Sequence, residues 1–310
     1  AKFFNRKKGE KLAGKTLDFD FYGDLPLLGW YGGAWWYFER VAPLGLKYFD
    51  PDTMKPSIAK PEYVLALENL IECCKYAPPD CARYTYPEGR EAYLKGRAFM
   101  CVQWPCIGKA ADAPFGATES TIHGKTGYKV VPGWDQGRSD VDQHEPHVNV
   151  VHRPLIPFGR TMSISKLSKN RDSAWEVIRF MCRADRLLSI CLGPWSPMGD
   201  TLCDPCTHSQ VESDLLKNAW PTAPDFLKVL IDSWESPPYP DLYIPGFMEY
   251  HDVASKEIVR ACTGKLSAKD CLDVVVAKWE DITDNRGRDA QKEFYNTVTI
   301  PKYIDLGIWK

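Results

Sequence analysis

The sequence lacks the short motifs that mark the common catalytic and nucleotide-binding sites. Its 310 residues contain no GxGxxG, GxxxxGK[ST], GxSxG or HExxH motif. The standard phosphate-binding loops, the nucleophile elbow and the zinc-protease helix are therefore excluded. Carboxylates are numerous, but none forms a pair whose spacing alone identifies a catalytic site. This pattern predicts neither a catalytic residue nor a cofactor, and we expect a protein that is not an enzyme.

The sequence also lacks an excess of either charge and a long apolar run. Its 39 Lys and Arg against 41 Asp and Glu leave a net charge of −2, which offers no basic field for nucleic acid. No apolar stretch approaches the roughly 18 residues of a membrane helix. The opening "AKFFNRKKGEKLAGK" is basic without an apolar core, so it resembles neither a signal peptide nor an anchor, although such a segment could have been removed.

The sequence has 11 cysteines, but almost none of them are spaced as the ligands of a metal site are. The count is odd, so at least one thiol is free or paired with another chain. Cys203 and Cys206 form the one CxxC, and His208 is too near to complete a standard zinc finger. A loop disulfide or two free thiols is the favoured interpretation, and we expect no metal. So many cysteines weakly favour a compartment that keeps most of them reduced.

A polar segment at 134–154 contains three histidines near acidic residues. A flexible loop is favoured there over a metal site. Those histidines are His144, His147 and His152.

Aromatic residues, in contrast, are abundant, with 11 Trp, 15 Tyr and 13 Phe. Most of them will belong to a core. An excess of tryptophan also suits sugar binding, because the indole face matches the C–H face of a pyranose ring.

Apolar periodicity predicts many helices and few strands, which is a helix-rich α/β pattern. The clearest helix begins at Pro61 and ends before Pro78, with Val64, Leu67 and Leu70 on its apolar face. Further helices are expected at 33–43, 86–96, 173–193, 209–219, 223–233, 247–263, 267–282 and 287–298. Strands are expected at 97–104, 126–131 and 161–165.

Several of these segments together resemble a known family. They are "KPEYVLALENLIECCKYAPP", "EAYLKGRAFMCVQWP", "GYKVVPGW", "FGRTMSISKLSKNRDSAWEVIRFM", "GPWSPMGDTL" and "IPGFMEYHDVASKEIVRACTGKLSAKDCLDVVVAKWEDI". In this order they resemble the extracellular solute-binding proteins of ABC importers, the sugar-binding group that includes maltose-binding members. The joint order over about residues 55–290 is the specific signal, since no single segment is decisive.

The resemblance implies a type II periplasmic-binding fold, in which two α/β lobes close on a sugar by a hinge. It implies a carbohydrate ligand, an ABC permease as partner and a periplasmic location. By position, the pocket candidates are Trp104, Arg160, Trp195, Tyr250 and His251, with weaker candidates Trp30, Trp35 and Trp36. For each aromatic among them, the alternative is a packed core residue.

The chain departs from the family at its beginning, which resembles the middle of the second lobe, so the N-terminal part of the first lobe is expected to be absent. We therefore expect a second-lobe segment at 1–157, a crossover with a remnant of the first lobe at 158–205, and a C-terminal helical part at 206–310. In this arrangement Arg160 faces the cleft. The strand "TMSIS" then pairs with a strand from residues 1–30, pairs with another polypeptide, or lies on an edge.

The departure leaves a second hypothesis open. A degenerate solute-binding fold could serve as an accessory or scaffold subunit of a larger assembly, in an organelle lumen or matrix. A truncated lobe exposes sheet edges and apolar surface, and both attract a protein partner.

Overall fold

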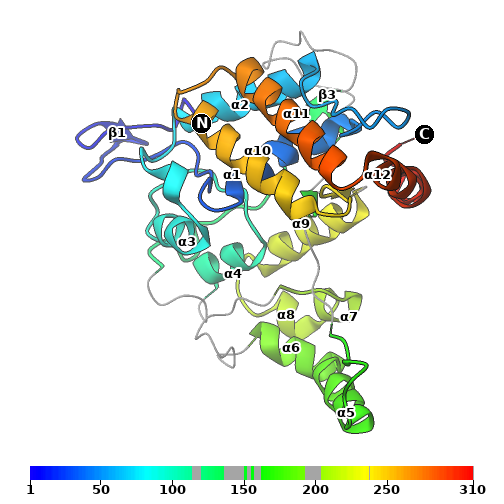
Figure 1. Cartoon of the computed structure of the whole chain (residues 1–310). Helices are drawn as coiled ribbons and strands as arrows, with labels where there is room; N and C mark the ends of the chain where they lie inside the picture. The colour runs from blue at the N-terminus through cyan, green and yellow to red at the C-terminus, as the bar shows by residue number, and fades with distance from the viewer. Residues whose placement is uncertain are drawn as a thin grey trace.

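The computed structural model describes residues 1–113, 120–135, 150–151, 155–156, 162–192, 204–236 and 238–309, and it is dominated by helices (Figure 1). The helices are α1 (Gly32–Val41), α2 (Pro61–Cys74), α3 (Tyr86–Leu94), α4 (Cys106–Asp112), α5 (Arg171–Met181), α6 (Ala184–Leu192), α7 (His208–Val211), α8 (Asp214–Lys217), α9 (Ala223–Glu235), α10 (Phe247–Cys262), α11 (Ala268–Asn285), α12 (Arg288–Phe294) and α13 (Ile300–Asp305), with 3₁₀ turns at Ala42–Leu44 and Cys81–Arg83 and a π turn at Tyr295–Thr299. None of the helices in these ranges combines the length and apolarity needed to cross a bilayer.

The strands are short and pair only in twos within the described ranges. They are β1 (Lys11–Leu12), β2 (Lys15–Thr16), β3 (Trp134–Asp135), β4 (Val150–Val151), β5 (Leu155–Ile156) and β6 (Tyr239–Pro240). The pairs β1–β2 and β3–β4 are antiparallel, whereas β5–β6 is parallel with Leu155 opposite Tyr239. The helix-rich α/β prediction is confirmed.

The strands predicted at 97–104 and 126–131 are wrong. Residues 97–104 make one isolated bridge, between Ala98 and Tyr22, and residues 126–131 have no regular structure. A strand forms only where a neighbouring strand supplies hydrogen bonds, and within the described ranges the segment 97–104 has such a neighbour only at Tyr22.

The predicted strand "TMSIS" is also not a strand where the structure describes it. Thr161 lies outside the described residues, and 162–165 have no regular structure. Met162 is 55% exposed. The described part of this segment therefore pairs with no strand from residues 1–30.

Four helices, α1, α2, α10 and α11, pack against one another and are called the helical frame below. Figure 1 shows α10 and α11 side by side, with α1 beside α10. Helix α1 approaches α10 closely because Gly33 has no side chain: a Cβ there would lie 2.8 Å from the Ser255 carbonyl oxygen. The Ser255 hydroxyl accepts from the Ala34 N–H (3.0 Å) and donates to the Tyr31 carbonyl oxygen (2.8 Å), so it fixes the start of α1 on α10.

The core of the frame is built around Trp279 of α11. Its indole is fully buried, and Nε1 donates to the Tyr250 carbonyl oxygen at 2.9 Å. The Phe49 ring stacks on it with centroids 5.4 Å apart. The Tyr250 hydroxyl is in turn 3.0 Å from Thr283 Oγ1. A large aromatic with its polar atom satisfied stabilises a core strongly.

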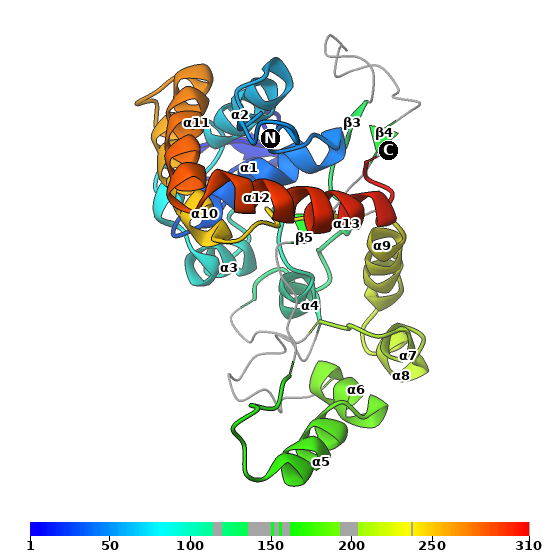
Figure 2. The same cartoon turned by 45° about the vertical axis from the view of Figure 1, so that its right-hand side comes forward.

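Helices α5 and α6, called the α5–α6 arm below, extend away from the frame at the bottom of Figures 1 and 2. The sequence predicts one helix at 173–193, but the structure breaks it. Cys182 departs from helical geometry (φ −87°, ψ 6°), and the Arg183 side chain pairs with Asp185 at 2.9 Å. Two separate short helices result.

The described contacts hold the arm mainly through α6. Cys191 on α6 is buried, and its carbonyl oxygen accepts from Lys109 Nζ at 3.1 Å. Helix α5 buries none of its residues, although it has a clear apolar side. The apolar side of α5, called the α5 apolar face below, includes Val177 and Met181, and the exposed rings of Trp175 and Phe180 lie at its two edges.

Candidate functional site

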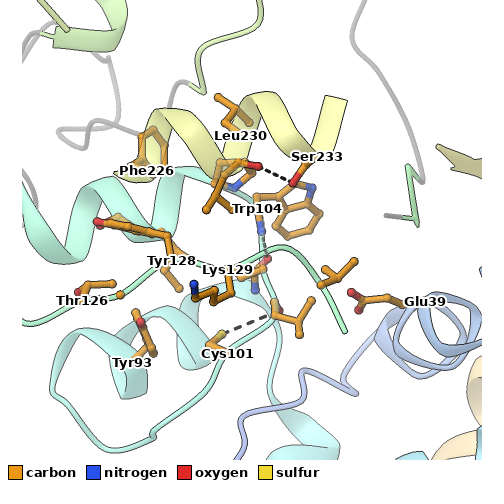
Figure 3. A pocket seen from close by; sticks show the side chains of 18 of the residues that line it. Glu39, Tyr93, Cys101, Trp104, Thr126, Tyr128, Lys129, Phe226, Leu230 and Ser233 are labelled. Atoms are coloured by element: carbon orange, nitrogen blue, oxygen red, sulfur yellow. Dashed lines mark hydrogen bonds between the residues drawn. The ribbon is translucent and has the colours of Figure 1, made fainter. Parts of the chain in front are cut away.

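A cavity of about 400 Å³ lies where α1, the segment 101–108, the segment 126–131 and α9 converge. Figure 3 shows side chains from these elements pointing into it. The lining is mainly apolar, and its aromatic members are Trp35, Trp36, Tyr93, Trp104, Tyr128, Phe226 and Trp234. A concave aromatic site with few polar groups is the usual form of a small-molecule pocket.

Trp104 lies in the middle of this lining (Figure 3). It stands two residues before α4, whose N-cap residue is Pro105. Its ring meets Trp35 edge-on at 6.5 Å and Tyr86 edge-on at 5.6 Å. Both contacts orient the indole, and its partial exposure leaves area for a ligand.

Helix α1 contributes Trp35, Trp36 and Glu39 to the same cavity, because residues three and four apart share a helix face. The Trp35 indole is held from behind. Its Nε1 donates to Asp241 Oδ2 at 3.2 Å, and Asp241 Oδ1 lies 2.6 Å from His251 Nε2. This buried carboxylate therefore positions one indole of the pocket.

The opposite wall is formed by Tyr128 and Phe226, whose rings meet edge-on at 5.4 Å. The Tyr128 hydroxyl donates to Asp112 Oδ2 at 3.0 Å, and burial raises the pKa of this phenol. Gly108 makes the fit possible, because a Cβ there would lie 2.7 Å from the Tyr128 ring. Tyr128 is thus fixed as a flat apolar surface with its polar end already satisfied.

The cavity also has polar groups that a ligand can use. Gln103 Nε2 is buried and has no hydrogen-bond partner among the described residues, although its Oε1 accepts from the Trp104 N–H at 2.9 Å. Burial raises the pKa of Glu39 to about 7, against the opposing effect of Arg40. Lys129 and Ser233 also line the cavity.

These groups suit recognition rather than bond-making. Aromatic planes bind the apolar faces of a ligand, and the carboxylate and amide bind its polar edge. Within the described ranges, no three His, Cys, Asp or Glu side chains lie close enough to hold a metal ion. Cys206 is exposed, and its Sγ lies 3.5 Å from Gln210 Oε1, whereas Cys203, His144, His147 and His152 lie outside those ranges.

The structure brings only some of the sequence candidates together. Trp104, Trp35 and Trp36 line the cavity. Trp30 is 80% exposed on the surface and is not part of the lining. The role of Trp104, Trp35 and Trp36 in binding stays a prediction.

Other candidates lie elsewhere. Tyr250 and His251 are fully buried in the frame, where His251 packs edge-on against the Trp35 ring at 6.1 Å. His251 thus lies behind the pocket wall rather than in it. Arg160 and Trp195 lie outside the described residues.

Sequence reasoning missed several lining residues, including Glu39, Tyr128, Phe226 and Trp234. A helical-face argument from Trp35 would have identified Glu39, four residues further on. Phe226 and Trp234 reach the cavity only because α9 packs there, and no local pattern indicates that.

Comparisons with known proteins give a fold and no closer relationship. No family model and no curated protein matches the sequence. Among solved structures, maltose-bound MalE3 from T. maritima matches with a TM-score of 0.64 at 19% identity, over 84% of this chain and 61% of that one. A solute-binding protein of an ABC transporter from Agrobacterium radiobacter K84, in complex with ribitol, matches at 0.65 and 18%, over 84% and 60%.

A third such protein, from Agrobacterium vitis S4 with bound D-mannitol, matches at 0.63 and 17% identity, over 86% of this chain and 62% of that one. The chain has the periplasmic solute-binding fold. It spans about 60% of the length of these solute-binding structures. The likeness at this identity concerns the fold alone and identifies neither a ligand nor a partner of this chain.

Proposed function

We propose that the chain is a non-enzymatic solute-binding module whose ligand is a carbohydrate or polyol, bound in the cavity around Trp104. The observation that carries this proposal is the placement of Trp104 and Trp35 in one aromatic cavity, within a fold whose solved relatives hold maltose, ribitol and mannitol. Delivery to an ABC permease outside the cytoplasm is part of the same proposal.

The physical basis is the match between an indole face and a sugar ring. Trp104 and Trp35 meet edge-on, so a ring stacked on Trp104 presents its edge toward α1. There the Glu39 carboxylate accepts from ligand hydroxyls, and Gln103 Nε2 donates to a ligand oxygen. A donor left unpaired costs about 1–3 kcal/mol when it is buried, which a bound hydroxyl would recover.

Calorimetric titration with maltose, ribitol, mannitol and other mono- and oligosaccharides tests this proposal. We expect heat of binding for at least one of them, and a loss of about tenfold or more in affinity for Trp104→Ala, since stacking on a tryptophan contributes on the order of 1 kcal/mol or more. Trp175→Ala is the matched control, because Trp175 is exposed far from the cavity. No heat with any ligand from demonstrably folded protein would refute the proposal.

The domain division belongs to this proposal as well. Residues 1–157 are assigned to a second-lobe segment, 158–205 to a crossover with a remnant of the first lobe, and 206–310 to a C-terminal helical part. Arg160 and Trp195 are proposed as cleft residues of the crossover segments.

A second candidate function rests on the α5 apolar face. Helix α5 buries none of its residues while exposing a tryptophan and a phenylalanine, and an unpartnered apolar face indicates a protein contact. The alternative function is an accessory or scaffold subunit, completed by a protein partner, in a larger assembly that includes an organellar one. Size-exclusion chromatography with light scattering tests it: a stable monomer at high concentration contradicts it.

A further inference from the structure

Glu39 stands in the cavity one helical turn from two indoles. Trp35 and Trp36 precede it by four and three residues on α1, so all three lie on one face. Figure 3 shows the carboxylate pointing from α1 toward the cavity. The site therefore combines a negative charge with aromatic surface.

The carboxylate has no hydrogen bond or ion pair within the described residues, although an arginine follows it. The Arg40 guanidinium is directed elsewhere: its Nε donates to Asn69 Oδ1 at 3.1 Å, its NH1 donates to the Trp36 carbonyl oxygen at 2.8 Å, and its NH2 lies 3.9 Å from Asp24 Oδ2. Lys129 also lines the cavity, but it is exposed to solvent, and no ion pair joins it to Glu39. The Glu39 carboxyl group is thus half-buried and has no ion-pair partner among the described residues.

We propose that the preferred ligand of this cavity is an amino sugar or amino polyol, whose ammonium group binds between the Glu39 carboxylate and the indoles of α1. This inference rests on the proposed function and narrows its ligand class. A hydroxyl in the same place donates one hydrogen bond to the Glu39 carboxylate. An ammonium gains a charge-assisted hydrogen bond and a cation–π contact, and both strengthen where water is excluded.

The charges around Glu39 also predict a proton effect. Burial raises the pKa of Glu39 to about 7, Arg40 opposes the shift and Asp24 adds to it. The other titratable groups near it are Lys129 across the cavity and Cys101, whose own raised pKa keeps its thiol neutral. A bound cation stabilises the carboxylate and lowers the pKa of Glu39, so an amino ligand that binds at about pH 6 must release a proton from it. A neutral sugar has no comparable effect.

Matched ligand pairs test the inference by calorimetry on the full chain. The pairs are glucosamine with glucose, and 1-amino-1-deoxysorbitol with sorbitol, each differing by one amino group. We expect the amino member of at least one pair to bind about tenfold more tightly. At about pH 6, in two buffers that differ in protonation heat, its binding should release close to one proton.

Glu39→Gln is expected to abolish both the preference for the amino member of each pair and the proton release. Glu62→Gln, at an exposed position on α2, is the control and should behave as the wild type. Thermal unfolding of each variant checks that it is folded.

Three outcomes would overturn the inference. Equal affinity within both pairs refutes it while leaving the proposed function intact. Ethanolamine has an amino group but no sugar ring. If it binds as tightly as glucosamine, the cavity recognises the amino group and not the carbohydrate. If neither member of any pair binds to folded protein, the proposed function fails together with the inference.

Discussion

The helical frame and the α5–α6 arm contain the same kinds of residue in opposite environments. Trp279 of α11 is fully buried among aromatic rings, whereas Trp175 of α5 is 53% exposed. Both helices are amphipathic, and α5 is the more sharply so. Amphipathicity therefore determines which face of a helix can be buried, and a partner element determines whether that face is buried.

The frame and the arm therefore differ in their proposed roles. The frame holds the pocket, because α1 lies on α10 through Ser255 and presents Trp35 and Glu39 to the cavity. The arm contributes none of the residues that line this cavity. Its apolar face instead supports the second candidate function, in which another protein covers it.

The largest predicted effect is a difference in the free energy of unfolding between two tryptophan variants. Trp279→Ala should lower the free energy of unfolding by about 3–5 kcal/mol, because it removes a fully buried indole and leaves a cavity. Trp175→Ala should change it by less than about 0.5 kcal/mol. Urea unfolding of both variants measures these changes, and equal losses would show that the arm is packed as tightly as the frame.

A smaller difference in stability is expected between variants of two glutamates that differ in burial. Burial alone would raise the pKa of Glu257, but Lys278 at 2.7 Å and Arg260 at 2.5 Å prevail and lower it. Glu257→Gln should cost about 1–2 kcal/mol at neutral pH, less than for a fully buried pair because both cations are half-exposed. Glu176→Gln on α5 breaks an exposed pair with Arg179 and should cost almost nothing.

The pH dependence of stability sharpens this test. A folded-state pKa below the unfolded value contributes stability above the unfolded pKa, about 4.3 for glutamate, and loses it as pH falls through the folded pKa. The difference between wild type and Glu257→Gln should therefore shrink as pH falls below about 4. A difference that persists at about pH 2.5 would mean that Glu257 acts through packing rather than charge.

The smallest predicted effect concerns the two helix starts. Ser267 Oγ accepts from the Asp270 N–H at 3.1 Å and caps α11, whereas Asn170 at the start of α5 makes no capping bond. Ser267→Ala should cost about 1 kcal/mol, and Asn170→Ala a few tenths or less. Thermal unfolding resolves the two, and a larger loss at Asn170 would contradict the assignment of the caps.

The sequence predicts the helices better than the strands, for a physical reason. Pro61 and the apolar spacing that follows it are local signals, and α2 begins at Pro61 as expected. A strand depends on a distant partner, and the apolar segment at 97–104 forms no strand because its one bridge partner in the described ranges is Tyr22. The single helix expected at 173–193 fails at Cys182, where nothing in the sequence marks a break.

The sequence likewise predicts only some residues of the candidate pocket. The resemblance identifies Trp104, which lines the cavity, but it also names Tyr250 and His251, which the frame buries. Glu39 was within reach of a helical-face argument. Phe226 and Tyr128 meet only after α9 has packed against the segment 101–108, and that contact is tertiary.

The crystal structure of the chain with a bound amino sugar or sugar tests the central claim most directly. We predict a ring stacked on the Trp104 indole, with its polar edge or ammonium within hydrogen-bonding distance of Glu39 and Gln103. A ring bound elsewhere on the chain, or a cavity that stays empty at saturating ligand, would contradict the claim that this aromatic cavity is the binding site.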